Sequence, residues 1–290
     1  MRERAPAKIN ACLFVGGTRA ADGRHELVSV MQAVDLADEL RLSRAEVDEV
    51  RCPGVEGPNL VSAALAAFRA ATGWDSEPVL IDVNKRIPVA AGMAGGSADA
   101  AAALRLLARA AGAVDLAGLR EIAAGLGADV PAQVLPGRYL ATGAGERVEA
   151  LAPVWPSYSV LVLPGDGGLS TAAVYREFDR LGLQRSPDDL AARLAEVRAA
   201  TARRPGGLPD ALVVNDLAPA AISLLPGVGE ALARVRDTGA DHAIVSGSGP
   251  TVLGLFSAAG VARSAAQALR RHHPGLVLTE PVASAGGLHA

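Results

Sequence analysis

The chain has 290 residues, which is enough for one large or two ordinary domains and for a sizeable buried core. Half of the residues are hydrophobic but only 3% are aromatic, so Ala, Val and Leu must form most of that core. The formal net charge is -3 and no long basic block occurs in the sequence. Because phosphate neutralisation requires clustered Lys and Arg, nucleic acid is not expected as the main partner.

Sequence features of exported and membrane proteins are missing. Residues 1–8 carry charge and no apolar stretch, which predicts no secretory signal. No run approaches the roughly 18 to 20 apolar residues that cross a bilayer, so no membrane partner is expected. Cys12 and Cys52 form no CxxC pair and no framework of disulfides, which is typical of a reducing compartment. We therefore expect a cytoplasmic protein.

Alternating apolar and polar positions predict two strands at the start of the chain, and helical spacing with a closing Gly73 predicts the first helix. The elements expected in this part are strands over 8–15 and 26–34, a strand pair within 38–50, a helix over 60–71 and a strand over 79–83. A glycine loop then begins at Pro88 and opens into a run of strong helix formers. Ser97 or Asp99 is expected to cap that helix.

The rest of the chain mixes helices and strands, which indicates an α/β or α+β protein. The expected elements are helices over 116–126, 172–181, 187–200 and 229–238, strands over 138–141 and 158–163, a strand, turn and strand over 242–256, and a final helix and strand ending at 282. Prolines and glycines between 153 and 168 suggest two domains, over 1–153 and 154–290.

The chain has 28 lysines and arginines together, and only Lys8 and Lys85 are lysines. A compact ammonium group is needed where a planar guanidinium does not fit, so these two positions are candidates for a functional site. The alternative is that two lysines have survived by chance. Asparagine is also scarce, and Asn10 and Asn84 lie close to the two lysines.

Two glycine-rich segments are candidates for binding an anion. Backbone N–H groups of Gly92 to Ser97 can converge on a phosphate, and the helix behind them adds its dipole. This loop matches neither GxxxxGK[ST] nor GxGxxG, and a tight strand-to-helix connection without ligand is the alternative. Ser246 to Pro250 lies between two β-rich runs and is, taken alone, more typical of an ordinary hairpin turn.

The order of several motifs resembles the superfamily of galactokinase, homoserine kinase, mevalonate kinase and phosphomevalonate kinase. The resemblance extends from Pro6 to about Phe256. The motifs that carry it are Pro6-Ala7-Lys8-Ile9-Asn10, Asp22-Gly23-Arg24-His25-Glu26-Leu27, Pro58-Asn59-Leu60, the loop from Pro88 to Ala100, Leu126-Gly127-Ala128-Asp129-Val130-Pro131, Gly143-Ala144-Gly145-Glu146, Thr171 with Tyr175, Asn215-Asp216-Leu217 and Ser246 to Pro250.

This resemblance implies a two-domain small-molecule kinase with its active site in the cleft between the domains. Within the superfamily the chain is most similar to kinases of the non-mevalonate isoprenoid pathway, whose acceptor is the 2-hydroxyl of a cytidine-diphosphate-linked methylerythritol. The resemblance implies Asp129 as the catalytic base and Lys8 as the catalytic cation. It implies that ATP is bound by Asn59, Lys85, Gly92, Gly95, Gly96 and Ser97. It also implies Mg²⁺, held mainly by phosphate oxygens and water. It assigns to the acceptor Asn10, Arg24, His25, Tyr175, Ser246 and Gly247.

Departures from the family pattern gather on the acceptor side. Arg24 stands where a tyrosine is usual, Ala132-Gln133 where aromatic residues are usual, and Ala218 where an acid is usual. Because arginine can stack on a base or bind a diphosphate, we still expect this chain to have the kinase activity that the resemblance implies. One alternative is the same chemistry on another polyol or nucleotide-linked alcohol, and a second is a non-catalytic relative that binds ATP or a metabolite. A decarboxylase of the same fold has no positive feature in the sequence, and monomer and homodimer both stay open.

Overall fold

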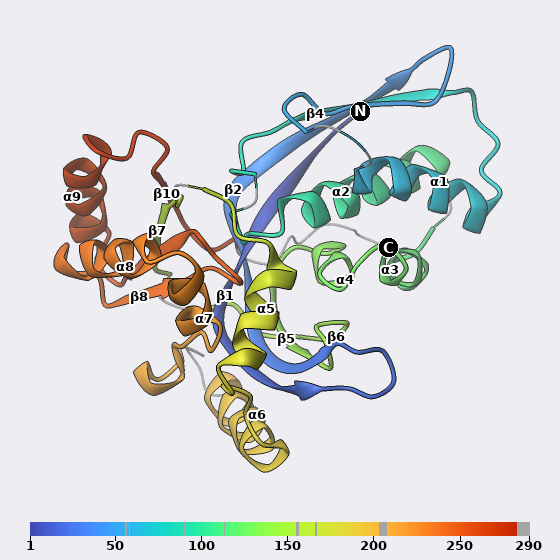
Figure 1. The fold of residues 1–290 in the computed structure, drawn as a ribbon. Helices are drawn as coiled ribbons and strands as arrows, with labels where there is room; N and C mark the ends of the chain where they lie inside the picture. The colour runs from blue at the N-terminus through green and yellow to red at the C-terminus, as the bar shows by residue number, and fades with distance from the viewer. Residues whose placement is uncertain are drawn as a thin grey trace.

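The computed structural model describes residues 1–55, 57, 59–89, 91–112, 114–154, 157–165, 167–202 and 208–282. Two sheets face each other, and two long N-terminal strands run through the middle of the molecule (Figure 1). The larger sheet has the strand order β3-β4-β2-β5-β6, and β1 pairs with β2. Its strands are β1 (Arg2–Thr18), β2 (His25–Arg44), β3 (Glu49–Arg51), β4 (Val79–Asn84), β5 (Arg138–Thr142) and β6 (Arg147–Ala150).

The first two predicted strands are confirmed as an antiparallel pair that is longer than the sequence pattern indicated. The ladder is irregular on either side of Lys8, between Pro6 and Lys8 and between Asn10 and Cys12. Such bulges re-aim side chains, and these flank the segment that reaches the candidate site. The predicted strand pair within 38–50 is wrong, because residues 38–44 continue β2 and β3 pairs in parallel with β4 instead.

Four helices pack beside the larger sheet: α1 (Leu60–Thr72), α2 (Gly95–Ala111), α3 (Leu116–Ala124) and α4 (Val130–Gln133). Helix α1 begins where the Asn59 side chain accepts a hydrogen bond from Ser62 N at 2.9 Å, and it ends at Gly73 with φ 65°. The predicted caps of α2 are wrong. This helix begins after Ala94, which has a left-handed φ of 52° and no capping side chain, so Ser97 and Asp99 lie inside the helix.

Every residue of α2 from Ala98 to Ala108 is buried. Most are alanines, so the helix axis can approach the sheet and its neighbouring helices closely. Leu104 and Leu107 share a core with Ile81 of β4 and Phe68 of α1. The N-terminus of α2 is thereby held firmly beside β1, with which the helix makes extensive contacts.

The smaller sheet has the order β10-β7-β9-β8, built from β7 (Ser159–Leu163), β8 (His242–Val245), β9 (Val252–Phe256) and β10 (Val277–Thr279). Two helices, α8 (Gly227–Asp237) and α9 (Ala259–Arg270), cover one face (Figure 1). The other face meets the larger sheet, where Val160 and Leu253 share a core with Ile9. The change of sheet falls between β6 and β7, and the predicted domain division at 153/154 stays a prediction.

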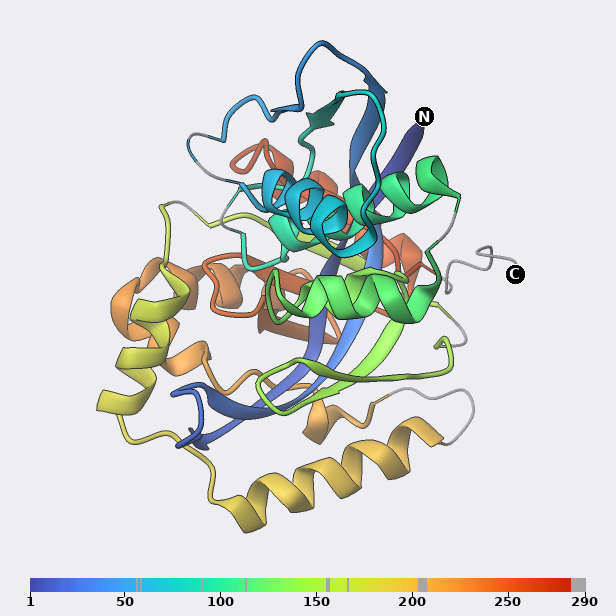
Figure 2. The same ribbon diagram turned by 90° about the vertical axis from the view of Figure 1, so that its right-hand side faces the viewer.

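The remaining helices are α5 (Thr171–Arg180), α6 (Pro187–Ala202), the 3₁₀ turn η1 (Asp210–Leu212) and α7 (Ala218–Leu224). In Figure 2, α6 lies along the lower edge of the molecule, below β1 and β2, where Leu190 and Val197 pack on Phe14. The elements β6 and α7 were not expected from the sequence. Strand β6 has no buried residue, and α7 is a single short helix with a proline in its first turn.

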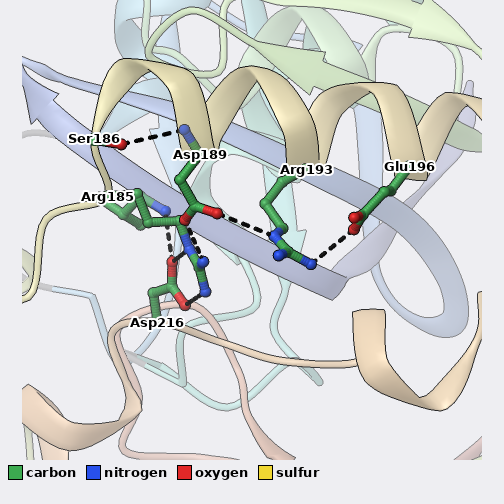
Figure 3. Close-up of polar contacts among 7 residues, drawn as sticks. Arg185, Ser186, Asp189, Arg193, Glu196 and Asp216 are labelled. Carbon is green, nitrogen blue, oxygen red and sulfur yellow. Dashed lines mark hydrogen bonds and ion pairs between the residues drawn. The ribbon is translucent and has the colours of Figure 1, made fainter.

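A charge network ties the segment before α7 to β1 and α6 (Figure 3). Arg185 donates to both carboxylate oxygens of Asp216, at 2.5 and 2.8 Å, and also to Asp189 at 2.6 Å. Asp216 in turn accepts from Val15 N at 3.0 Å. This network fixes the neighbouring Asn215 against the candidate site.

Among the described residues, no helix is long and apolar enough to span a membrane.

Candidate active site

The functional candidate is a cavity of about 890 Å³ beside β1 and β2 of the larger sheet. Its wall combines β1, the start of α1 and α2, the segment before α4, α5 and the turn after β8. It brings together residues that are far apart in the sequence, and every residue assigned above to catalysis, ATP or the acceptor lines it except Ser246. These are Lys8, Asn10, Arg24, His25, Asn59, Lys85, Gly92, Gly95, Gly96, Ser97, Asp129, Tyr175 and Gly247.

Lys8 and Asp129, which both line the cavity, form an ion pair with 3.5 Å between Nζ and Oδ2. The Lys8 side chain is 9% exposed and that of Asp129 is 32% exposed, so the carboxylate lies nearer the open space. Lys8 Nζ also donates to Asn10 Oδ1 at 2.8 Å, and Asn10 Nδ2 donates to Ser29 Oγ at 2.7 Å. These bonds hold the ammonium group at a fixed place beside a carboxylate that can accept a proton.

A glycine loop forms the second part of the site. At Gly92 φ is 68°, and an added Cβ would lie 2.1 Å from Ser246 O. The loop is held from two sides, because Ser246 Oγ donates to Gly92 O at 3.1 Å and Lys8 N donates to Met93 O at 3.2 Å. Behind it, the first N–H groups of α2 have no acceptor within the helix. Such a helix N-terminus favours phosphate oxygens.

Lys85 forms the third part and does not lie free at a strand end. Its Nζ donates to Asp99 Oδ2 at 2.7 Å and also to Asp38 Oδ2, and both carboxylates are buried. Asp38 Oδ1 accepts from Arg86 N and Ile87 N, at 2.5 and 2.8 Å. Burial raises the pKa of Asp99 to about 7, although Lys85 opposes the shift and Asp38 adds to it. The burial of Lys85 lowers its pKa, but the two carboxylates outweigh this and raise it overall.

The fourth part is a pair of rings on the opposite wall. The centroids of His25 and Tyr175 are 4.8 Å apart and their planes are tilted by 36°. His25 Nε2 lies 2.7 Å from Asp179 Oδ1 of α5, which fixes the imidazole. Burial raises the pKa of Tyr175 to about 12, with a further contribution from the Asp129 charge, so the phenol stays protonated. Arg24 closes this wall and donates from Nη2 to Ala144 O at 3.1 Å.

Comparison with known proteins identifies the family. The family model described as "GHMP kinases N terminal domain" matches residues 59–137, and that described as "GHMP kinases C terminal" matches residues 194–275. A 4-diphosphocytidyl-2-C-methyl-D-erythritol kinase of Streptomyces avermitilis is 42% identical, over 92% of this chain and 91% of its own. A kinase of the same name from Methylobacterium radiotolerans is 40% identical over 95% and 96%.

The chain belongs to the GHMP kinase family.

Solved structures agree with this GHMP kinase assignment. A crystal structure of a 4-(cytidine 5'-diphospho)-2C-methyl-D-erythritol kinase aligns with a TM-score of 0.79 and 33% identity, over 97% of this chain and 99% of that one. A homoserine kinase from Cytophaga hutchinsonii aligns with a TM-score of 0.75 at 18% identity, over 98% and 95%. The second match shows that the fold is shared. The predicted α/β fold of this kinase superfamily is therefore confirmed.

Some of the motifs that identified this GHMP kinase hold the site together from outside. Ser246 is fully buried and bonds the glycine loop, so it does not open into the cavity as expected for an acceptor ligand. Asn215 Nδ2 donates to Val245 O and Gly247 O, at 2.8 and 2.7 Å, and thereby supports the turn that faces the glycine loop. Pro58 and Ala90, which belong to two of the motifs, lie outside the described residues.

Two of the departures on the acceptor side lie away from the cavity of this GHMP kinase. Ala132 packs in a core with Leu13 and Val174, and Gln133 is buried with its carbonyl bonded to Arg105. Their side chains therefore do not contribute to the cavity wall. Ala218 is not among the lining residues either, whereas Arg24 is, so Arg24 is the departure that bears on the acceptor.

Sequence reasoning missed three acidic residues that shape the GHMP kinase site. Asp38 lies on β2, 47 residues from the lysine that it pairs with, and Asp179 follows the predicted tyrosine by four positions on α5. Asp99 was expected only as a helix cap. The one sequence signal for the Asp38 and Asp99 pair is the retained Lys85, because a buried ammonium group requires an opposite charge.

Proposed function

We propose that this GHMP kinase transfers the γ-phosphate of ATP to the 2-hydroxyl of 4-diphosphocytidyl-2-C-methyl-D-erythritol, in non-mevalonate isoprenoid precursor biosynthesis. The observation that carries the proposal is the Lys8 and Asp129 pair, placed in one cavity between the glycine loop and the His25 and Tyr175 rings. An acceptor alcohol anchored at the rings and a triphosphate anchored at the loop would meet at this pair. The names of the relatives at 40 to 42% identity support the same acceptor.

The chemical step needs a base, a cation and accurate positioning. The acceptor oxygen forms a bond to the γ-phosphorus while the bond from that phosphorus to the β,γ-bridging oxygen breaks, and ADP leaves with the bond electrons. Asp129 takes the hydroxyl proton, which is released late along a loose transition state, so an ordinary carboxylate is a sufficient base. Lys8 holds the acceptor oxygen and offsets negative charge on the transferring group.

The nucleotide is held on the other side mostly by backbone groups. The N–H groups of Gly95, Gly96 and Ser97 at the start of α2 would bind phosphate oxygens, and the helix dipole favours their charge. Gly95 leaves little room for a side chain, since an added Cβ would lie 3.2 Å from Ile87 Cγ2 and 3.3 Å from Lys85 Nζ. Asn59 and Lys85, both on the cavity wall, are proposed to face the adenosine.

Mg²⁺ would accompany ATP. Within the described part of the chain, no group of three or more His, Cys, Asp or Glu side chains could hold a metal ion alone. This fits a hard cation that keeps phosphate oxygens and water as ligands. The available protein oxygens are the Ser97 hydroxyl and Asp99, whose Oδ1 is buried and lacks a hydrogen-bond partner. When bound, Mg²⁺ neutralises charge on the phosphates.

The cytidine would bind at the ring wall. Tyr175 offers an aromatic face, and stacking on such a face contributes about 1 to 3 kcal/mol per base. Because Asp179 occupies Nε2 of His25, the other ring nitrogen is the one available to the base. Arg24 offers a charged guanidinium group to the diphosphate or a planar face to the base.

A second candidate acceptor is another polyol or nucleotide-linked alcohol, and Arg24 is the observation that favours it. A coupled assay of ADP release with Mg·ATP and purified 4-diphosphocytidyl-2-C-methyl-D-erythritol separates the two, followed by phosphorus NMR of the product. A new monoester at the 2-hydroxyl is the expected result. No turnover, together with no rise in melting temperature on adding cytidine nucleotides, would refute the proposed acceptor and send the search to other alcohols.

The proposed setting is the cytoplasm, with a small-molecule alcohol as partner and no nucleic acid or membrane involved. Cys12 and Cys52 are both free thiols, and burial raises the pKa of Cys12 to about 12. An unreactive buried thiol is compatible with a reducing compartment. Monomer and homodimer are both retained.

A further inference from the structure

A second cavity, of about 420 Å³, shares no wall residue with the candidate active site. Its size lies within the range of pockets that hold small organic ligands. Ala11 of β1, Val213, Leu255 and Phe256 form apolar walls, and Arg138 of β5 and Tyr158 supply polar groups. No function proposed above uses any of these residues.

Arg138 is a buried cation with few partners. The residue is 5% exposed and forms no ion pair with any residue that the structure describes. Among the described residues it makes one side-chain hydrogen bond, from Nη1 to Ala152 O, which is long at 3.3 Å. Burial lowers the pKa of Arg138, which expresses the penalty of holding this charge away from water. A guanidinium group has five N–H donors, and within the described part of the chain one of those of Arg138 is engaged.

Arg105 shows what a buried structural arginine looks like in the same protein. It is equally buried, yet its guanidinium donates to Glu3 Oε1 at 3.0 Å, Gln133 O at 2.6 Å and Arg4 O at 2.7 Å. Arg105 lines neither of the two cavities. The contrast indicates that the sparse bonding of Arg138 is a property of its cavity and is not general to buried arginines here.

Tyr158 adds a second donor to the same wall. Burial raises the pKa of Tyr158 to about 12, and the nearby Arg138 charge opposes the shift, so the hydroxyl keeps its proton at neutral pH. Tyr158 lines the cavity. Its hydroxyl is therefore placed to donate to a ligand there.

The acidic groups of this cavity, Asp210 and Asp241, are both exposed. Asp241 accepts from Ser257 N at 2.5 Å. Asp210 has a side chain that is 95% exposed and lies 3.3 Å from His242 Nε2. One buried cation balances one negative charge, and the two exposed carboxylates repel a second. The site therefore favours a monoanion over a dianion.

We propose that this cavity binds a small organic carboxylate, with its oxygens on Arg138 and Tyr158 and its apolar body against Val213 and Leu255. The proposal does not depend on the kinase function, because the two cavities have separate walls. Its ligand class is set by one guanidinium group, one phenol and apolar walls, and a planar carboxylate matches the guanidinium fork.

Sodium benzoate is the probe for the test, measured by calorimetry on the full chain. Arg138→Met should weaken binding about tenfold or more, since a charged hydrogen bond is lost. Tyr158→Phe should weaken it less, and Arg138→Lys should give an intermediate loss. Lys8→Met is the matched control, because it removes a buried cation from the other cavity and should leave benzoate affinity unchanged. Benzyl alcohol and phenyl phosphate should bind more weakly than benzoate.

Crystals soaked in 4-bromobenzoate give a second readout, which does not depend on whether Arg138→Met folds. The expected result is an anomalous bromine peak in the cavity with the carboxylate beside Arg138. Benzoate affinity equal in Arg138→Met and the wild type would overturn the proposal. So would an absence of both calorimetric binding and a bromine peak at millimolar probe, or a loss of binding in Lys8→Met alone.

Discussion

The two sides of the active-site cavity are built from different groups of the chain. On the nucleotide side, the glycine loop and the start of α2 present mainly backbone N–H groups, and Gly92 packs directly on the backbone at Ser246. On the acceptor side, the wall consists of the side chains of His25, Tyr175 and Arg24. The Lys8 and Asp129 pair lies between them.

This difference predicts how each side responds to substitution. Backbone donors are the same in every sequence, so the nucleotide side depends on glycines that leave room and permit a positive φ. Side-chain donors and rings change with each substitution, so the acceptor side can change its ligand while the fold is kept. Arg24 in place of a ring is consistent with such a change on the acceptor side alone.

The largest effect is expected at the pair that joins the two sides. Asp129→Asn removes the base but keeps the size of the side chain, so kcat should fall by about 10³, within the usual range for general-base catalysis. ATP affinity should stay close to that of the wild type. Asp75→Asn, at an exposed aspartate, is the matched control. Turnover within tenfold of the wild type would remove Asp129 from the mechanism.

The next effect tests the backbone-built side. Gly92→Ala would place a Cβ 2.1 Å from Ser246 O at a residue with φ 68°, so the loop must move. We expect kcat/KM for ATP to fall about 100-fold, with a lower melting temperature, since strained left-handed residues cost about 1 to 3 kcal/mol before the clash is added.

Gly96→Ala is the matched control for this loop. Outside its own helix backbone and among the described residues, an added Cβ there meets Leu60 Cδ1 alone, at 3.9 Å, so the melting temperature should not fall. Equal losses of stability in the two variants would show that the close packing of Gly92 on the Ser246 turn does not hold the loop.

The sequence predicts the parts of this molecule whose signal is local. Alternation along β1 and β2, the helical spacing of α1 with its closing Gly73, and the glycine loop before α2 each occupy a short window. The pairing of Lys85 with Asp38 spans 47 residues and is set by strand register, which no local pattern reports. The predicted cap of α2 failed because Ala94 takes a left-handed conformation that alanine rarely adopts.

The sequence resemblance identified residues at or near the site, but it did not always predict what each of them contacts. Ser246 and Asn215 belong to motifs that identify the family, yet they act by holding the glycine loop and its neighbouring turn. Arg138 belongs to no motif, and its cavity is formed by segments from both halves of the chain. Such a site becomes visible only when β5, β9 and the residues around Tyr158 are placed together.

A smaller effect tests the side-chain-built wall. Tyr175→Leu removes the ring, and the KM for the acceptor should rise about 5- to 150-fold, equivalent to about 1 to 3 kcal/mol of stacking. The KM for ATP should not change, because the tyrosine lies on the opposite side. Tyr175→Phe keeps the ring and should stay near the wild type. If Tyr175→Leu and Tyr175→Phe raise the KM for the acceptor equally, the hydroxyl group is what matters and the stacking assignment fails.

The smallest effect concerns the charged side chains of the nucleotide side, and it is a dependence of stability on pH that is caused by Asp99. Because burial raises the pKa of Asp99 to about 7, well above the ordinary aspartate value of about 3.9, the folded protein keeps a proton between pH 4 and 7 that the unfolded chain has lost. The free energy of unfolding should therefore decrease as the pH rises through this window. Asp99→Asn carries no such proton, so its stability should change less between pH 4 and 7, measured by urea unfolding at several pH values. Asp75→Asn should follow the wild type, and an unaltered slope in Asp99→Asn would mean that Asp99 is ionised throughout, held by Lys85 alone.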